Sequence, residues 1–221
     1  SHYWQQYPWA EPCDGYLRQV EIFQGRGNFE REDPPDGWRT VFRNNGASVQ
    51  SALLKGHHLG FVGGTDNHLA WPAQNTTQTT KRLSAENRHI ERTGGFVYTG
   101  AWLQERNRQA AFDALYQRHS WACWDTRAVV RLTLDGVLQG GELTLTPGAE
   151  ITAAVMLAAE GALETLELVS ATRCWNVPRA ADQRDIDTSL ALDLESDDRF
   201  VYLRARQIDG ALVYASPVFL R

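Results

Sequence analysis

The sequence predicts an α/β part over residues 1–125, followed by an all-β part over residues 126–221. The first part has apolar patterns in the order strand, helix, strand, loop, strand, helix, which is typical of proteins built from βα units. The second part has short alternating runs separated by turn signals, which are typical of an antiparallel β-sandwich. We therefore expect two domains with a boundary after residue 125.

The elements of the first part follow from residue periodicity and from glycines. Short runs rich in strand formers predict three strands, at residues 17–23, 59–62 and 95–99. Apolar residues at helical spacing predict two helices, at residues 47–55 and 103–119. Gly56 stands where the first of these helices ends, as glycine often does. Residues 70–93 are polar and irregular, and so long a loop typically covers a site or moves.

The second part is predicted to be made of seven short strands. Their alternating runs cover residues 128–134, 143–146, 151–158, 163–169, 189–194, 200–207 and 211–220. Asp209 followed by Gly210 lies between two of these runs, and this pair predicts a tight hairpin. The regular spacing favours two antiparallel sheets packed face to face.

The composition is that of an ordinary globular protein, with 43% hydrophobic and 22% charged residues. The net charge of −5 argues against general nucleic-acid or membrane-surface binding. No apolar stretch is long enough to cross a bilayer. The three cysteines form no CxxC pattern, and we expect reduced thiols and a cytoplasmic setting.

The first part is too short for a complete barrel of βα units, which needs about 250 residues. The chain also opens at Ser1 without an initiator methionine, and its single methionine is Met156. These observations predict a fragment or a product trimmed from a longer precursor. Open strand edges would then need a partner, either a second copy or an N-terminal partner chain that completes the barrel.

The most informative motif is GFVGGTDNH at residues 60–68. Asp66 and His68 are two residues apart just past a predicted buried strand, so both side chains can face one point. Carboxylate oxygen together with imidazole nitrogen suits Zn, Mn or Fe. The alternative is a polar turn in which Asp66 caps the next segment.

Four segments together resemble the PHP superfamily of metal-dependent hydrolases, particularly its carbaryl-hydrolase-like branch. They are VEIFQGRGNFE at residues 20–30, the stretch 52–68, the stretch 94–122 and the tail 200–220. The resemblance implies the C-terminal half of a distorted βα barrel, followed here by the β-sandwich. It also implies two or three divalent metal ions that activate water to hydrolyse a small-molecule phosphoester, carboxyl ester or carbamate.

The resemblance assigns roles to particular residues. Asp66 and His68 match the superfamily's last metal-binding motif, and His2 resembles a third ligand from an earlier strand. Glu21 and Glu30 match acidic positions, which implies a place behind the ligands or against the substrate. Glu21 lies in a predicted strand and can point either way, so the alternative is a structural partner. No residue is assigned as the catalytic acid or base.

Other histidines are open to two interpretations. His89 lies in the long loop and could contact the substrate, or it could be a solvated loop residue. His57 and His58 precede the strand at residues 59–62, so they lie at the end opposite to Asp66 and His68.

The chain also departs from the superfamily's pattern. No His-x-His pair occurs in the 221 residues, and the middle Glu and His ligands are missing. The alternative is therefore a non-catalytic scaffold or binding module that retains a degenerate half-barrel.

Overall fold

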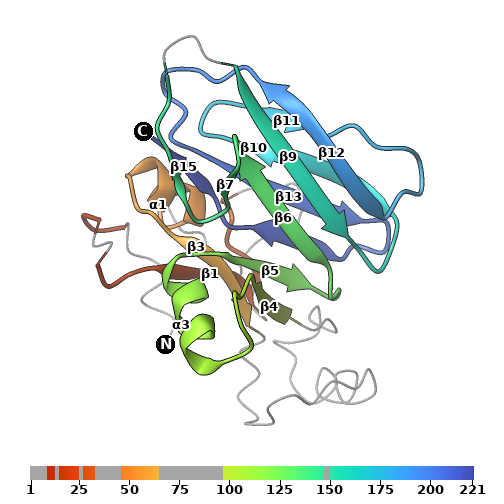
Figure 1. The fold of residues 1–221 in the computed structure, drawn as a ribbon, viewed down its shortest axis with the longest axis horizontal. Helices are drawn as coiled ribbons and strands as arrows, with labels where there is room; N and C mark the ends of the chain where they lie inside the picture. The colour runs from red at the N-terminus through yellow and green to blue at the C-terminus, as the bar shows by residue number, and fades with distance from the viewer. Residues whose placement is uncertain (1–8, 13–14, 25–26, 33–45, 65–96, 147–149) are drawn as a thin grey trace.

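The chain folds into three open β-sheets and two short helices in the ranges that the structure describes (Figure 1). This computed structural model describes residues 9–12, 15–24, 27–32, 46–64, 97–146 and 150–221. The expected half of a distorted βα barrel is wrong, and the fold is β-rich. In such a barrel successive strands are parallel, whereas β4 and β5 here pair antiparallel and continue into the sheet of the second part.

One parallel βαβ unit is present in the first part. It comprises β1 (Gln19–Gln24), β2 (Gly27–Asn28), α1 (Val49–Leu54) and β3 (Gly60–Gly64). β1 pairs parallel with β3 and antiparallel with the short β2. α1 starts at Ser48, whose side chain accepts a hydrogen bond from the Ser51 backbone N–H, and it ends before Gly56, whose φ is +88°.

The largest sheet joins strands from both predicted domains. Its main path is β11 (Cys174–Asn176), β10 (Leu163–Val169), β13 (Phe200–Gln207), β14 (Leu212–Ala215), β5 (Ser120–Trp124) and β4 (Val97–Ala101). Two short strands, β15 (Val218–Leu220) and β8 (Glu142–Leu143), join it beside β13. The predicted boundary after residue 125 falls at the end of β5, which is hydrogen-bonded to β14. The division into two domains stays a prediction, and the helix α3 (Arg108–Tyr116) connects β4 to β5.

A four-stranded antiparallel sheet covers one face of the largest sheet (Figure 1). Its strands are β12 (Asp185–Leu192), β9 (Ile151–Ala158), β6 (Val129–Leu134) and β7 (Val137–Leu138). Residues along β9 alternate between buried and more exposed positions, so one face of the sheet is in the core. Each of the seven predicted runs overlaps a strand, the run at residues 143–146 by Leu143 alone. Gly210, with φ +91°, lies in the hairpin between β13 and β14.

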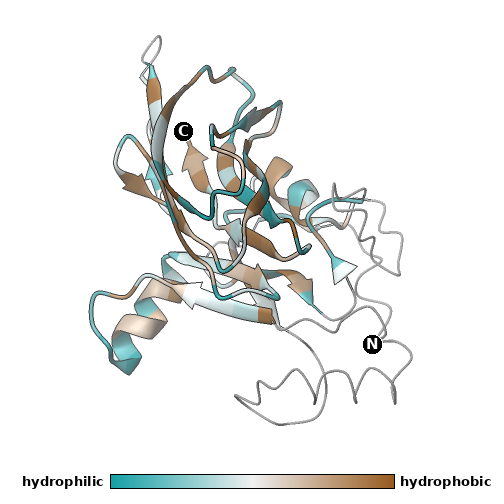
Figure 2. Ribbon diagram, turned by 90° about the vertical axis from the view of Figure 1, so that its right-hand side faces the viewer, coloured by the Kyte–Doolittle hydropathy of each residue, from teal (hydrophilic) through white to brown (hydrophobic). Residues whose placement is uncertain are grey.

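The βαβ unit packs on the largest sheet through aromatic side chains. Phe23 meets Trp124 edge to face with ring centroids 6.1 Å apart, and Phe61 meets Tyr202 at 5.3 Å. Brown hydrophobic stretches mark the strands on both sides of this contact (Figure 2). Neither described helix is long and apolar enough to cross a membrane.

Candidate functional site at the carboxyl ends of β1 and β3

The two parallel strands of the βαβ unit end side by side. Their register runs from Gln19 opposite Gly60 to Gln24 opposite Gly64, with an irregularity after Glu21. In α/β proteins, the crevice beyond the carboxyl ends of parallel strands is the usual place for a binding site. We therefore expect the predicted metal ligands at this edge of the sheet.

The predicted ligands lie just beyond what the structure describes. Asp66 and His68 follow the last residue of β3, Gly64, by two and four positions. His2 and His89 also lie outside the described ranges. The site roles of these residues stay predictions. The side chains that are described at this edge include Glu21 and Gln24.

Glu21 places a carboxylate at this edge. Its side chain is exposed, and its Oε2 accepts a hydrogen bond of 3.0 Å from Gln24 Nε2. A Cβ atom added to Gly64 would lie 2.7 Å from Glu21 Oε1. The missing side chain at position 64 thus leaves room for the carboxylate beside the last residue of β3.

Gln24 contributes an oxygen that is not hydrogen-bonded. Its residue is 2% exposed, and its Oε1 atom is buried without a hydrogen-bond partner. Native proteins rarely leave a buried polar atom unpaired, and such an atom calls for an explanation. A carbonyl oxygen there can accept a hydrogen bond from water or from a bound molecule, or contact a hard cation.

Glu30 lies in a buried environment, unlike the exposed Glu21. Its carboxylate is 1% exposed and accepts hydrogen bonds from the hydroxyl groups of Tyr202 at 2.5 Å and Tyr214 at 2.9 Å. Arg204 Nη1 lies 2.6 Å from the same carboxylate. The side chains come from β13 and β14, so Glu30 ties the βαβ unit to the largest sheet.

Arg204 is shared by the two carboxylates of this cluster. Arg204 also donates to Glu167 at 2.8 Å, which places its guanidinium between two carboxylates. Burial lowers the pKa of Arg204, but Glu30 and the two tyrosines outweigh that effect and raise it above its ordinary value. Burial and the neighbouring Glu30 raise the pKa of Tyr202 well above its ordinary value, so its phenol stays neutral. We call Glu30, Tyr202, Arg204, Tyr214 and Glu167 the junction cluster.

Sequence reasoning missed the partners of Glu30, although one signal was available. β13 reads FVYLRARQ, and both of its faces are covered except at one half-buried position. An arginine inside a strand covered on both faces needs a buried carboxylate, because an unpaired buried charge is very costly. Arg204 thus predicts an acidic partner, but the sequence does not say which one.

His57, His58 and the two described thiols give no alternative site. His57 is buried with Nε2 2.8 Å from the Ala10 carbonyl, and His58 lies 3.1 Å from Glu142. Both precede β3, as predicted, and so lie at its amino end. Burial raises the pKa of the Cys123 thiol to about 12 and that of Cys174 to about 11, which makes both poor nucleophiles at neutral pH.

Within the described ranges, no group of three or more His, Cys, Asp or Glu side chains could hold a metal ion. No protein-family model matches the chain, and neither the curated proteins nor the solved structures give a match. Function is therefore argued from the chain's own residues.

Proposed function

We propose that the chain is part of a metal-dependent hydrolase whose site lies at the carboxyl ends of β1 and β3. The observation that carries the proposal is the unpaired Gln24 Oε1 beside the Glu21 carboxylate, at the edge that Asp66 and His68 follow. The resemblance of four segments to the PHP superfamily supports the same reaction class. Small phosphoesters, carboxyl esters and carbamates are the substrates that this resemblance implies.

The donor atoms fit divalent metal ions. Glu21 and Gln24 offer hard oxygen atoms, and Asp66, His68 and His2 would add a carboxylate and two imidazoles. This mixture of oxygen and nitrogen suits Zn, Mn or Fe. Such ions, when bound, would lower the pKa of a water molecule and polarise a carbonyl or phosphoryl oxygen.

Each residue of the chain would have a separate task. Asp66, His68 and His2 would hold the metal, while Glu21 would orient a neighbouring histidine through its ring N–H. The Gln24 amide fixes the Glu21 carboxylate by its 3.0 Å hydrogen bond, and its free Oε1 would accept a hydrogen bond from water or substrate.

The proposal is tested by elemental analysis of the full 221-residue chain after reconstitution with Zn or Mn. We expect bound metal in the wild-type chain and its loss in the double variant Asp66→Ala/His68→Ala. A matched control, His58→Ala/Asp113→Ala, removes the same two residue types elsewhere and should retain the metal. Assays with nitrophenyl phosphate and nitrophenyl acetate would then separate phosphoester from carboxyl ester hydrolysis.

The result that would overturn the proposal is a wild-type chain that binds no metal under these conditions. The same holds for metal that is retained by the double variant. The absence of bound metal favours the second candidate, a non-catalytic scaffold, whereas retained metal would place the metal site away from Asp66 and His68. The junction cluster is compatible with that role, because it serves to hold the βαβ unit on the sheet.

A further inference from the structure

A pocket lies at one end of the packed sheets, far along the chain from β1 and β3. It has a volume of about 760 Å³ and lies between the start of β9 and the segment that follows β12. Functional small-molecule sites have volumes of roughly 300–1,000 Å³. The pocket is thus large enough for a small organic molecule.

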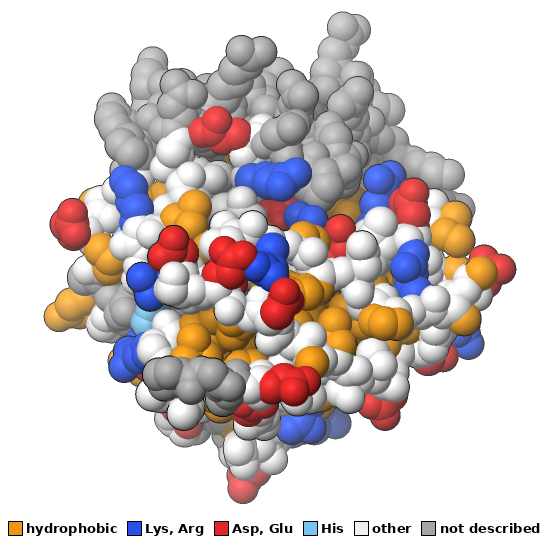
Figure 3. Space-filling view, turned by 90° about the horizontal axis from the view of Figure 1, so that it is seen from above, with side chains coloured by type: hydrophobic (Ala, Val, Ile, Leu, Met, Phe, Trp, Pro, Cys, Tyr) orange, Lys and Arg blue, Asp and Glu red, His pale blue; other side chains and the backbone are white. Residues whose placement is uncertain are grey.

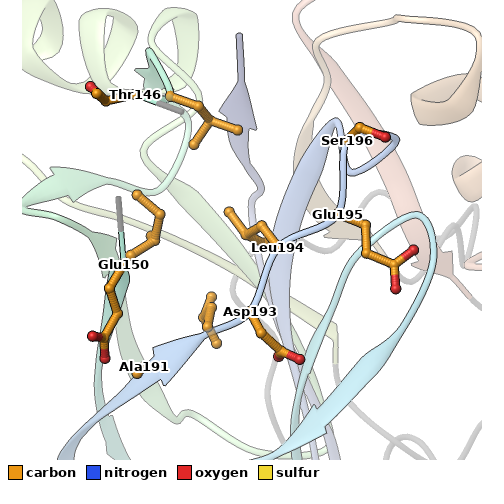
Figure 4. Close-up of a pocket in the computed structure, with 10 residues that line it drawn as sticks. Thr146, Glu150, Ala191, Asp193, Leu194, Glu195 and Ser196 are labelled. Atoms are coloured by element: carbon orange, nitrogen blue, oxygen red, sulfur yellow. The ribbon is translucent and has the colours of Figure 1, made fainter. Parts of the chain in front are cut away.

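The walls of the pocket are apolar because it opens on the end of the core. Ile151 and Leu192 are core residues at 4% and 3% exposure, and Leu145 and Leu194 pack partly against the same core. Leu194 points into the space between the two walls (Figure 4). Seen from above, hydrophobic side chains are exposed on this face among acidic and basic ones (Figure 3).

The rim of the pocket carries an excess of negative charge. Glu150, Asp193 and Glu195 line it, and the carboxylates of Glu150, from the β9 wall, and of Asp193, from the segment after β12, both lie below Leu194 in Figure 4. Arg173 forms ion pairs with Asp193, at 2.5 Å, and with Glu195. Three carboxylates against this one guanidinium leave two net negative charges at the rim.

We propose that this pocket binds a small organic cation, with its apolar body against Leu145 and Leu194 and its protonated amine facing Glu150 and Asp193. The apolar walls favour a carbon skeleton over a hydrated metal ion. The acidic rim repels carboxylates and phosphates and gives an ammonium group charge-assisted hydrogen bonds. The inference does not depend on the hydrolase proposal, because the pocket uses none of the residues at β1 and β3.

The test compares three probes with the same phenylbutyl body on the full chain by isothermal titration calorimetry at low salt. They are 4-phenylbutylamine, 4-phenylbutan-1-ol and 4-phenylbutyrate. We expect the amine to bind about fivefold or more tightly than the alcohol, since a hydrogen bond to a charged group is stronger than a neutral one. We expect no measurable binding of the carboxylate.

Two charge-reversal variants locate the amine. Glu150→Lys changes a pocket residue, whereas Asp187→Lys makes the same change in net charge on the exposed face of β12, outside the pocket. We expect Glu150→Lys to weaken amine binding about tenfold or more and Asp187→Lys to change it less than about twofold. Leu194→Gln should weaken the amine and the alcohol alike, with a thermal melt to show that the chain remains folded.

Three results would overturn the inference. One is the absence of saturable amine binding by the wild-type chain. Another is equal weakening by Glu150→Lys and Asp187→Lys, which would indicate general attraction to an acidic protein. The third is unchanged binding in folded Leu194→Gln, which would place the probe elsewhere.

Discussion

Two glutamates nine positions apart in the stretch VEIFQGRGNFE have opposite environments. Glu30 is buried in the junction cluster, where Tyr202, Tyr214 and Arg204 all contact its carboxylate. Glu21 is exposed at the carboxyl ends of β1 and β3, beside a glutamine whose oxygen is unpaired. The sequence predicts a site role for both, yet only Glu21 is exposed.

The difference shows how structural and functional polar groups can be told apart. A buried carboxylate that is hydrogen-bonded by its neighbours and paired with arginine has nothing further to offer a ligand. An unpaired buried oxygen costs free energy in the folded chain, so it is the better indicator of binding. The junction cluster should therefore control stability, and the edge at β1 and β3 should control metal affinity.

Glu30→Gln should have the largest effect on stability. The substitution leaves Arg204 buried with one of its two carboxylates, and breaking a buried ion pair typically costs about 3–5 kcal/mol. Glu167→Gln is the matched control, because Glu167 is 20% exposed and should cost only about 1 kcal/mol. Urea unfolding followed by tryptophan fluorescence measures both, and equal losses would contradict the central place of Glu30.

Tyr202→Phe should have a smaller effect that depends on pH. Loss of the hydrogen bond to Glu30 should cost about 1.5–3 kcal/mol at neutral pH. The pKa of Tyr202 is raised in the folded chain, so above about pH 10 the unfolded phenol ionises while the folded one keeps its proton. The free energy of unfolding of the wild-type chain should then fall by up to about 1.4 kcal/mol per pH unit as pH rises above 10.

Urea unfolding of both proteins between pH 8 and 11 tests this dependence. Tyr202→Phe should lose stability less steeply than the wild-type chain above pH 10, because it lacks the phenol of Tyr202 and keeps only that of Tyr214. Below that pH the difference between the two proteins should be constant. Parallel curves over the whole range would show that Tyr202 does not couple folding to alkaline pH.

The strands of the second part could be predicted because their patterns are local. Alternation in residues 151–158 and 200–207 predicts β9 and β13 with the bounds that the structure has. The arrangement of the first part could not be predicted in this way. The residue pattern of a strand at residues 95–99 is the same whether the strand belongs to a parallel barrel or pairs antiparallel. The direction of pairing depends on its partner strand, which in the structure is the antiparallel β5.

The candidate site shows the same limit of local patterns. The Asp-x-His spacing indicates Asp66 and His68, and strand order indicates the edge at β1 and β3. Neither pattern distinguishes Glu21 from Glu30, because the partners of Glu30 on β13 and β14 lie more than 170 positions away. Contacts over such distances depend on the register of strands that sequence periodicity does not fix.

Gln24→Met should have the smallest effect on stability and still change metal binding. Methionine has a similar shape, removal of the unpaired Oε1 is favourable, and the exposed Glu21 carboxylate that loses the Gln24 Nε2 hydrogen bond can be solvated, so we expect a change within about 1 kcal/mol. If Gln24 supports the metal site through Glu21, the affinity for Zn or Mn should fall by about 10–100-fold.

Gln207→Met is the matched control for this prediction. Gln207 is 1% exposed and both of its amide atoms are unpaired, but it lies at the end of β13, away from β1 and β3. We expect this variant to be as stable as the wild-type chain or more so, with unchanged metal affinity. Calorimetric titration of the two variants with Zn or Mn measures whether the metal affinity depends on Gln24. If Gln24→Met binds metal as the wild-type chain does, its unpaired oxygen is a packing defect like that of Gln207, and the metal site must be sought elsewhere.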